Sequence, residues 1–348
     1  MTNHAIADDT STGASPTAII QEAKTMKAIV HDTYGEADVL QLRDIPTPTV
    51  GDDDVLVQVN AAGVDAGVWH LMTGLPYAVR IAGYGVRAPK HQVRGMDLAG
   101  TVEAVGKNVT RFQVGDAVFG TADGSYAEYV TTTEDKLATK PTNLTFEQAA
   151  AVPTSAFTAL EAVRDRGEVA PGQQVLVIGA SGGVGTFAVQ IAKALGAEVT
   201  GVASGTKLEM VCSIGADHVI DYKLQDFTGL GHRYDVIIDT GGLRSISSLR
   251  RALTPTGTLV IVGGEGGNKW TGGAGRGLRA IALSPFVKHN LRNFIAANKT
   301  EDLWTLKDLI EAGDLTPVID KSFPLNEVSD AIRYMTDGRA AGKLVVTI

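Results

Sequence analysis

The sequence predicts an α/β protein in which a mostly β domain accompanies a doubly wound parallel sheet. Three observations support this fold class. The chain has 348 residues, enough for two domains at roughly 100–200 residues each. From residue 27 to about 150, short β-rich runs alternate with turn residues, a pattern typical of a partly open barrel. Beyond residue 150, helix-like stretches alternate with apolar strands, which indicates a parallel sheet covered by helices.

The β-rich part contains three clear strand candidates, at residues 55–59, 100–105 and 114–119. Segment 71–93 departs from this pattern because it is irregular and contains Pro76, Gly83, Gly85 and Pro89. A long loop inside a compact domain often forms a lid or a pocket wall. We therefore expect this segment to border a substrate pocket.

The second half contains five apolar stretches that we expect to be buried strands, at residues 175–179, 198–203, 218–221, 234–239 and 257–262. Segment 268–290 is rich in glycine, and we expect a loop there, either near a site or as a plain linker. The pattern then predicts a helix from Leu325 to Asp337 and a strand over 343–348. Residues 1–25 are small and polar, so we predict a flexible extension.

Composition argues against several classes of function. The net charge of −8 gives no general attraction for phosphate backbones, so we do not expect nucleic acid as a partner. Cys212 is the single cysteine, which fits a reducing compartment. Glycines and a lysine interrupt the most apolar stretch, at 175–203, so we expect no membrane span. With no charged-then-apolar leader at the start, we expect a cytoplasmic protein.

The strongest motif is an apolar strand at 175–178, followed by a turn from Gly179 to Gly185 and a helix over 186–195. A dinucleotide pyrophosphate needs unpaired N–H groups at a helix N-terminus, and glycine lets the backbone approach it closely. We predict that dinucleotide binding involves Ser181, Gly182, Gly183 and Val184. Ala180 stands where the usual motif has its first glycine, so a glycine-rich turn of another α/β protein is the alternative.

The residues after the second parallel strand predict which dinucleotide binds. An enzyme that uses NAD usually has Asp or Glu there, whereas this chain has Ser204 and then Lys207. A hydroxyl and an ammonium group favour a 2′-phosphate that a carboxylate would repel. We therefore predict NADPH as the cofactor. The alternative for Lys207 is a solvated residue at the start of a helix.

Four motifs together resemble the quinone oxidoreductase branch of the medium-chain dehydrogenase/reductase superfamily: residues 26–30, 95–102, 179–185 and 219–222. The resemblance runs in order from 26 to 348. It implies a GroES-like catalytic domain over 26–148, completed by about 320–348, and a Rossmann cofactor-binding domain over 149–319. It also implies an active site in the cleft between them and a homodimer joined through the cofactor domain.

The resemblance also implies roles for individual residues. Lys207 and Tyr222 are expected to hold the 2′-phosphate, and Gly263 and Gly264 to lie beside the nicotinamide. Lys343 matches a residue that faces the cofactor cleft, although a strand-edge lysine is the alternative. Thr158 opens a helix on the predicted cleft, where we expect it to contact the nicotinamide carboxamide.

The residues also predict chemistry without a metal. Zinc enzymes of this superfamily hold the ion with Cys, His and Cys, and the first two positions here resemble Asp65 and Met96. Near the third lies Ala151, with no thiol. Methionine is a poor zinc ligand and one Asp cannot hold the ion, so we predict no zinc. The alternative is a stray metal ion bound by Asp65, Asp97 and His70.

Without a metal, activated acceptors suit a hydride donor best, namely quinones or α,β-unsaturated carbonyl compounds. Hydrogen-bond donors aimed at the acceptor oxygen would stabilise its developing charge. Tyr77 is one candidate, with a packing aromatic as the alternative, and His70 is a second, with a structural histidine as the alternative. Asp65, where the family commonly has asparagine, is either an acid with a raised pKa or the cap of the following helix.

Two alternatives to the quinone or enone reductase remain at this point. One is an enoyl-thioester reductase or alcohol dehydrogenase of the same superfamily. Basic residues at the mouth of a pocket would favour a thioester substrate, and four of them lie near segment 71–93: Arg80, Arg87, Lys90 and Arg94. The other is a non-catalytic NADPH-binding protein with a structural or sensing role.

Overall fold

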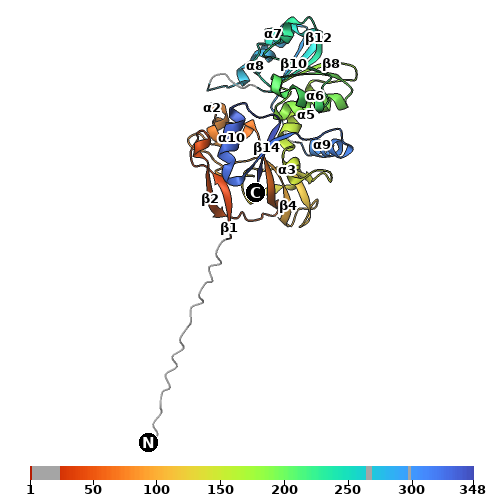
Figure 1. Ribbon diagram of the computed structural model, residues 1–348. Helices are drawn as coiled ribbons and strands as arrows, with labels where there is room; N and C mark the ends of the chain where they lie inside the picture. Colours follow the sequence, from red (N-terminus) through yellow and green to blue (C-terminus); the bar gives the residue numbers. More distant parts are fainter. Residues whose placement is uncertain (2–23, 264–268, 297–298) are drawn as a thin grey trace.

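The computed structural model describes residue 1 and residues 24–263, 269–296 and 299–348. Two lobes are visible in Figure 1, each built around a sheet. The lower lobe contains β1, β2, β14 and the end of the chain, whereas the upper lobe contains β8, β10 and β12. The extension predicted at 1–25 lies almost wholly outside the described residues, as does Gly264.

The lower lobe combines an antiparallel pair, β1 with β2, and a seven-stranded sheet in the order β14-β15-β3-β4-β5-β7, with β6 also paired to β3. Its strands are β1 (Thr25–Val30), β2 (Gln41–Pro46), β3 (Asp54–Val64), β4 (Asp97–Val105), β5 (Ala117–Thr121), β6 (Tyr129–Thr133), β7 (Leu137–Thr139), β14 (Ile319–Pro324) and β15 (Lys343–Thr347). Strands from both ends of the sequence therefore share one sheet.

The upper lobe holds a parallel six-stranded sheet in the order β10-β9-β8-β11-β12-β13. Its strands are β8 (Gln174–Ile178), β9 (Glu198–Ala203), β10 (His218–Asp221), β11 (Tyr234–Asp239), β12 (Leu253–Ile261) and β13 (Asn290–Asn293). The chain winds outward from β8 first toward β10 and then, through β11, toward β13. This doubly wound order confirms the predicted fold class.

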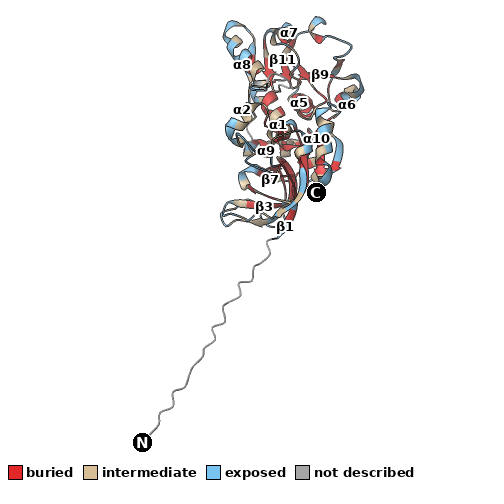
Figure 2. Cartoon of the chain, turned by 90° about the vertical axis from the view of Figure 1, so that its left-hand side faces the viewer, coloured by how far each residue is buried: buried red, intermediate tan, exposed pale blue. Residues whose placement is uncertain are grey.

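Helices cover both sheets and connect the lobes. They are α1 (Ala66–Thr73), α2 (Tyr77–Val79), α3 (Phe146–Ala150), α4 (Pro153–Leu160), α5 (Gly183–Ala194), α6 (Leu208–Ser213), α7 (Ile246–Arg251), α8 (Ala274–Leu283), α9 (Thr300–Ala312) and α10 (Val328–Thr336). Buried residues concentrate in the strands at the centre of each lobe, and exposed residues lie mainly at the periphery (Figure 2). Each lobe thus has an apolar cluster of its own, and a third cluster runs across the junction between the two sheets.

Two expectations from the sequence were wrong. Segment 268–290 is not simply a loop, because α8 occupies Ala274–Leu283 and packs on β13. Its Gly277 reflects close packing, since an ideal Cβ there would lie 2.4 Å from Asn293. Segment 71–93 also begins with helical structure, because α1 runs to Thr73 and α2 is followed by a helical turn over Arg80–Tyr84.

Candidate active site

The glycine turn after β8 lies where the upper sheet reverses its winding, between β8 and β11. Gly179 has φ 79°, a conformation that favours glycine, and an ideal Cβ there would lie 2.5 Å from Thr240 Oγ1. An ideal Cβ on Gly185 would lie 2.0 Å from the Gly179 oxygen, so α5 approaches the turn as closely as backbone allows. The start of α5 at Gly183 thus presents free N–H groups at the crevice where dinucleotides bind in such sheets.

The turn is attached directly to the lower lobe. The Gly342 N–H donates to the Ser181 oxygen at 2.9 Å, and Gly182 and Gly342 form a parallel bridge. The next residue, Lys343, passes beneath the turn, because an ideal Cβ on Gly183 would lie 3.0 Å from its Cδ. Lys343 is only 2% exposed, so it is an internal residue at the junction of the lobes and not a solvated strand-edge lysine.

Three charged residues gather at one edge of the lower sheet because of its topology. Asp65 follows the last residue of β3, Asp97 is the first residue of β4 and Lys343 is the first of β15. Since β3 runs antiparallel to both β4 and β15, these ends meet at the same edge. Sequence alone could not show this, because the three residues are far apart in the chain.

Asp97 is the centre of this group and is fully buried. Its carboxylate accepts the Thr154 N–H at 3.0 Å and lies 3.5 Å from the Lys343 ammonium, which also donates to Ser155 Oγ at 3.1 Å. Burial raises the pKa of Asp97 to about 6; Lys343 opposes this rise and the nearby Asp65 adds to it. Sequence analysis did not single out Thr154 and Ser155, which contribute from the first turn of α4.

Asp65 caps α1. Its Oδ1 accepts the Val68 N–H at 3.2 Å, and its Oδ2 is buried with no hydrogen-bond partner among the described residues. This geometry matches the helix-cap alternative. Tyr126, which sequence analysis did not single out, donates its hydroxyl to the Gly63 oxygen at 3.1 Å, and its pKa is raised by burial, Asp65 and Asp97.

His70 and Tyr77 both belong to the lower lobe, one within α1 and one at the start of α2. His70 Nδ1 is 2.7 Å from the Leu75 oxygen, so this nitrogen must carry the proton. Tyr77 reaches toward the upper lobe: its N–H donates to the Lys269 oxygen at 2.8 Å, and its ring meets that of Trp270 edge to face at 5.3 Å. The segment predicted to wall a pocket therefore contacts the segment before α8.

The residues predicted to bind the 2′-phosphate lie at the ends of β9 and β10. The Lys207 ammonium is already hydrogen-bonded to backbone, to Ala340 at 2.5 Å and Gly338 at 3.2 Å, and burial lowers its pKa. Ser204 precedes the turn that contains Lys207, and Tyr222 is 46% exposed. Sequence analysis missed one carboxylate here: Asp221 Oδ2 would lie 2.6 Å from an ideal Cβ on Gly205.

The last two predicted cofactor residues have clear structural constraints. Thr158 Oγ1 donates to the Thr154 oxygen at 2.7 Å within α4, so its hydroxyl has a partner inside the helix. Gly263 follows β12, and an ideal Cβ there would lie 2.5 Å from the Thr240 oxygen. The backbone after β12 therefore packs tightly on the backbone after β11.

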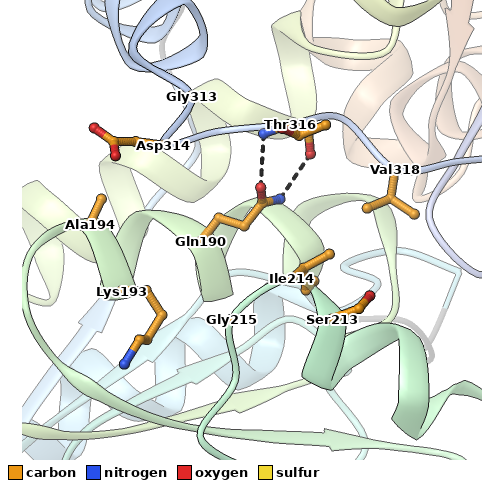
Figure 3. Close-up of a pocket in the computed structure, with 10 residues that line it drawn as sticks. All are labelled: Gln190, Lys193, Ala194, Ser213, Ile214, Gly215, Gly313, Asp314, Thr316 and Val318. Atoms are coloured by element: carbon orange, nitrogen blue, oxygen red, sulfur yellow. Dashed lines mark hydrogen bonds between the residues drawn. The ribbon is translucent and has the colours of Figure 1, made fainter.

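One cavity lies away from these residues. Its volume is about 590 Å³, between α5, the end of α6 and the segment after α9 (Figure 3). Inside it the Gln190 side chain bonds both backbone groups of Thr316, donating at 3.0 Å and accepting at 2.8 Å. It contains no residue of the predicted site.

Two protein-family models and several known proteins match this chain. Residues 51–142 match the family described as alcohol dehydrogenase GroES-like domain, and residues 214–346 match the one described as zinc-binding dehydrogenase. The chloroplastic NADPH-dependent alkenal/one oxidoreductase of Arabidopsis thaliana is 33% identical, over 97% of this chain and 83% of the relative. The chain belongs to the medium-chain dehydrogenase/reductase superfamily, in its quinone oxidoreductase-like branch.

Two further members of the superfamily support the same assignment. The quinone oxidoreductase of Homo sapiens is 31% identical, over 93% of this chain and 98% of the relative. The structure of the quinone oxidoreductase from Coxiella burnetii superimposes with a TM-score of 0.81 at 30% identity, covering 93% of this chain and 100% of that one. The family resemblance expected from the sequence motifs is thus confirmed.

Asp65 and Met96, which sequence analysis compared with the first two zinc-ligand positions of the superfamily, both lie close to Gly67. An ideal Cβ on Gly67 would lie 2.8 Å from Asp65 Oδ1 and 3.4 Å from the Met96 sulfur. Over the part of the chain that the structure describes, no three His, Cys, Asp or Glu side chains are grouped to hold a metal. Within the same residues, no helix is long and apolar enough to cross a bilayer.

Proposed function

We propose that the protein is a zinc-independent, NADPH-dependent oxidoreductase that transfers hydride to a quinone or an α,β-unsaturated carbonyl compound. The observation that carries this proposal is the contact between the glycine turn and the edge of the lower sheet. Gly342 bonds the turn, and Lys343, Ser155 and Asp97 lie directly beneath it. A cofactor held by the turn would therefore face the lobe that carries the acceptor-side residues. The names of the two relatives, an alkenal/one and a quinone oxidoreductase, favour these acceptors.

The residues of the turn fit a dinucleotide. Ser181, Gly182, Gly183 and Val184 surround the start of α5, where backbone N–H groups would hold the pyrophosphate. At the far end, Ser204, Lys207 and Tyr222 would hold the 2′-phosphate, and Lys207 would exchange its backbone partners for it. Thr158, Gly263 and Lys343 would border the nicotinamide, which supplies the hydride when bound.

On the acceptor side, we assign different roles to the three candidate residues. Tyr77 is the preferred hydrogen-bond donor to the acceptor oxygen because it belongs to the loop that closes against Trp270. His70 orients this loop through Leu75, and Asp65 fixes the start of α1. No step requires a metal, since Asp65 and Met96 make a poor zinc site.

We assign the cofactor domain to residues 149–319 and the catalytic domain to residues 26–148 and about 320–348. We also propose that two copies of the chain form a homodimer through their cofactor domains. β13 is the terminal strand of its sheet, and three large apolar side chains nearby are exposed: Leu278, Ile281 and Phe286. Such a surface favours association with a second copy. A Leu278→Glu variant should shift the mass in light scattering from dimer to monomer.

The lone thiol of Cys212 supports a reducing compartment, which we take to be the cytoplasm.

The decisive experiment follows NADPH oxidation with benzoquinone, phenanthrenequinone, crotonaldehyde, cyclohexenone and crotonyl-CoA, each with and without EDTA. Turnover of a quinone or enone that prefers NADPH and ignores EDTA supports the proposal. Preference for crotonyl-CoA would favour the enoyl-thioester reductase, and loss of activity with EDTA would overturn zinc independence. Tight NADPH binding without any turnover would favour the non-catalytic alternative.

A further inference from the structure

A buried arginine on the acceptor side has no role in the function proposed above. Arg94 is 5% exposed and lies just before Gly95, between β1 and the turn that leads to Tyr126. Its backbone is bonded on both sides: its N–H donates to the Ile29 oxygen at 3.2 Å, and its oxygen accepts the Tyr126 N–H at 2.9 Å. The position of the side chain is therefore set by two neighbouring segments.

The guanidinium of Arg94 is poorly compensated. Its Nη2 donates to the His91 oxygen, while its buried Nε has no hydrogen-bond partner among the described residues. Among those residues, no carboxylate lies within ion-pair distance of it either. A guanidinium stays charged in a protein, and a buried charge without a partner is strongly unfavourable. The site therefore favours an acceptor of hydrogen bonds that carries negative charge.

The neighbouring histidine does not supply that charge. His31 is fully buried, and its Nδ1 lies 3.1 Å from the Thr33 oxygen, so this nitrogen carries the proton. Burial and the charge of Arg94 lower the pKa of His31 to about 4, which leaves the ring neutral at physiological pH. The charge of Asp123, an exposed residue, favours the charged form of Arg94, but the two side chains form no ion pair among the described residues.

A small cavity faces this guanidinium. It has room for about one water-sized group, near 10 Å³, and its walls include Arg94, Leu71, Tyr84, Gly95 and the exposed Asp123. Three of these wall residues lie on the segments of the proposed site: Leu71 follows His70 on α1, Tyr84 ends the helical turn after α2, and Gly95 precedes Met96. The cavity thus lies beside the segments that carry the proposed acceptor residues.

We propose that this cavity binds a carboxylate oxygen of the acceptor, so that the substrate class is an enone or quinone that carries a carboxylate. The inference rests on the proposed function and extends it. A carboxylate oxygen matches the size of the cavity, accepts hydrogen bonds from Arg94 and neutralises its charge. The rest of the acceptor would extend from there toward Met96 and the cleft.

The test compares trans-β-benzoylacrylate with its methyl ester, which has the same enone but no charge. In the wild-type protein, kcat/KM for the acid should exceed that for the ester by about tenfold or more, as expected for a hydrogen bond to a charged group. Arg94→Gln should remove this preference by lowering kcat/KM for the acid alone. Arg94→Lys, which keeps the charge, should restore part of it. Arg87→Gln, an exposed arginine of the same segment, is the matched control and should keep the preference.

The outcomes separate this inference from the proposed function. Turnover of the ester without any preference for the acid would overturn the carboxylate subsite while leaving the reductase intact. If neither compound is reduced, binding of the saturated analogue β-benzoylpropionate to the NADP-loaded protein decides. Protection against thermal unfolding in the wild type but not in Arg94→Gln supports the subsite, and equal protection refutes it. If Arg94→Gln does not fold, the comparison of acid and ester in the wild type and Arg94→Lys decides alone. Equal protection by acetate would show that the site binds any free anion.

Discussion

The two sides of the proposed active site are built by different means. The side proposed to hold the cofactor, around the turn from Gly179 to Gly185, is made of backbone, and its defining contacts are those that a Cβ would prevent. The lower-lobe side is made of charged and polar side chains, with Asp97 and Lys343 buried against each other. A backbone site depends on local geometry within one short segment. A side-chain cluster depends on the pairing of distant strands, so the two sides should respond differently to substitution.

The largest expected effect is on the side-chain cluster. Lys343→Met would leave the buried Asp97 without its cation, and breaking one partner of a buried pair typically costs about 3–5 kcal/mol. We expect the free energy of unfolding, measured with urea at pH 8, to fall by that amount. Lys288→Met, at an exposed lysine, should change it by less than about 0.5 kcal/mol. Similar losses in the two variants would show that Asp97 does not need Lys343.

The same cluster predicts how stability depends on pH. The pKa of Asp97 is raised from its ordinary value of 3.8 to about 6, so the folded protein binds more protons than the unfolded chain between these values. The contribution of Asp97 is therefore full below pH 4 and is lost as the pH rises to about 6, by up to about 3 kcal/mol. Asp97→Asn should remove this part of the pH dependence of unfolding. An unchanged profile would contradict the raised pKa.

The backbone side should respond to a single methyl group. Gly185→Ala forces a Cβ against the Gly179 oxygen, and we expect a loss of about 1–3 kcal/mol in stability together with weaker NADPH binding. Gly229→Ala is the matched control because an ideal Cβ there meets no atom within 4 Å. Calorimetric titration with NADPH checks both variants. Full NADPH affinity in Gly185→Ala would show that the turn does not bind the cofactor.

The choice between NADPH and NADH sharpens the comparison further. On the proposed cofactor side, this choice depends on side chains and not on the backbone. Lys207→Ala should raise the KM for NADPH about tenfold, the usual effect of losing a charged hydrogen bond, and leave that for NADH unchanged. Asp221→Asn should lower the KM for NADPH, since it removes a carboxylate beside Gly205. Equal effects of Lys207→Ala on both cofactors would contradict the 2′-phosphate assignment.

The smallest effect is expected at Asp65. Asn caps helices about as well as Asp, so Asp65→Asn should keep the start of α1 and change stability by less than about 0.5 kcal/mol. Activity with the best acceptor should stay within about twofold. A large loss of turnover, with the fold intact by circular dichroism, would instead identify Asp65 as the proton donor.

The sequence predicted what is local and missed what depends on distant pairing. The strand, turn and helix around Gly179 were predicted because all their signals lie within one short segment. Sequence analysis grouped Asp65 with Asp97 but not with Lys343, because the approach of Lys343 depends on the register of β3 with β4 and β15. The helix α8 was missed because its glycines suggested a loop, whereas Gly277 is there to let the helix approach Asn293. The contact between Trp270 and Tyr77 could not be predicted either, because the two residues are far apart in the sequence.

The position of β15 has a consequence for how the protein is made. This strand follows every other described element in the chain, yet it pairs with β3 inside the lower sheet, and the residue before it bonds the glycine turn of the upper lobe. Domains generally fold as they emerge during synthesis, N-terminal parts first. Here the lower sheet cannot be completed until the last strand has been synthesised. The emerging chain must therefore keep an open sheet edge beside β3, where a chaperone would find its apolar surface exposed.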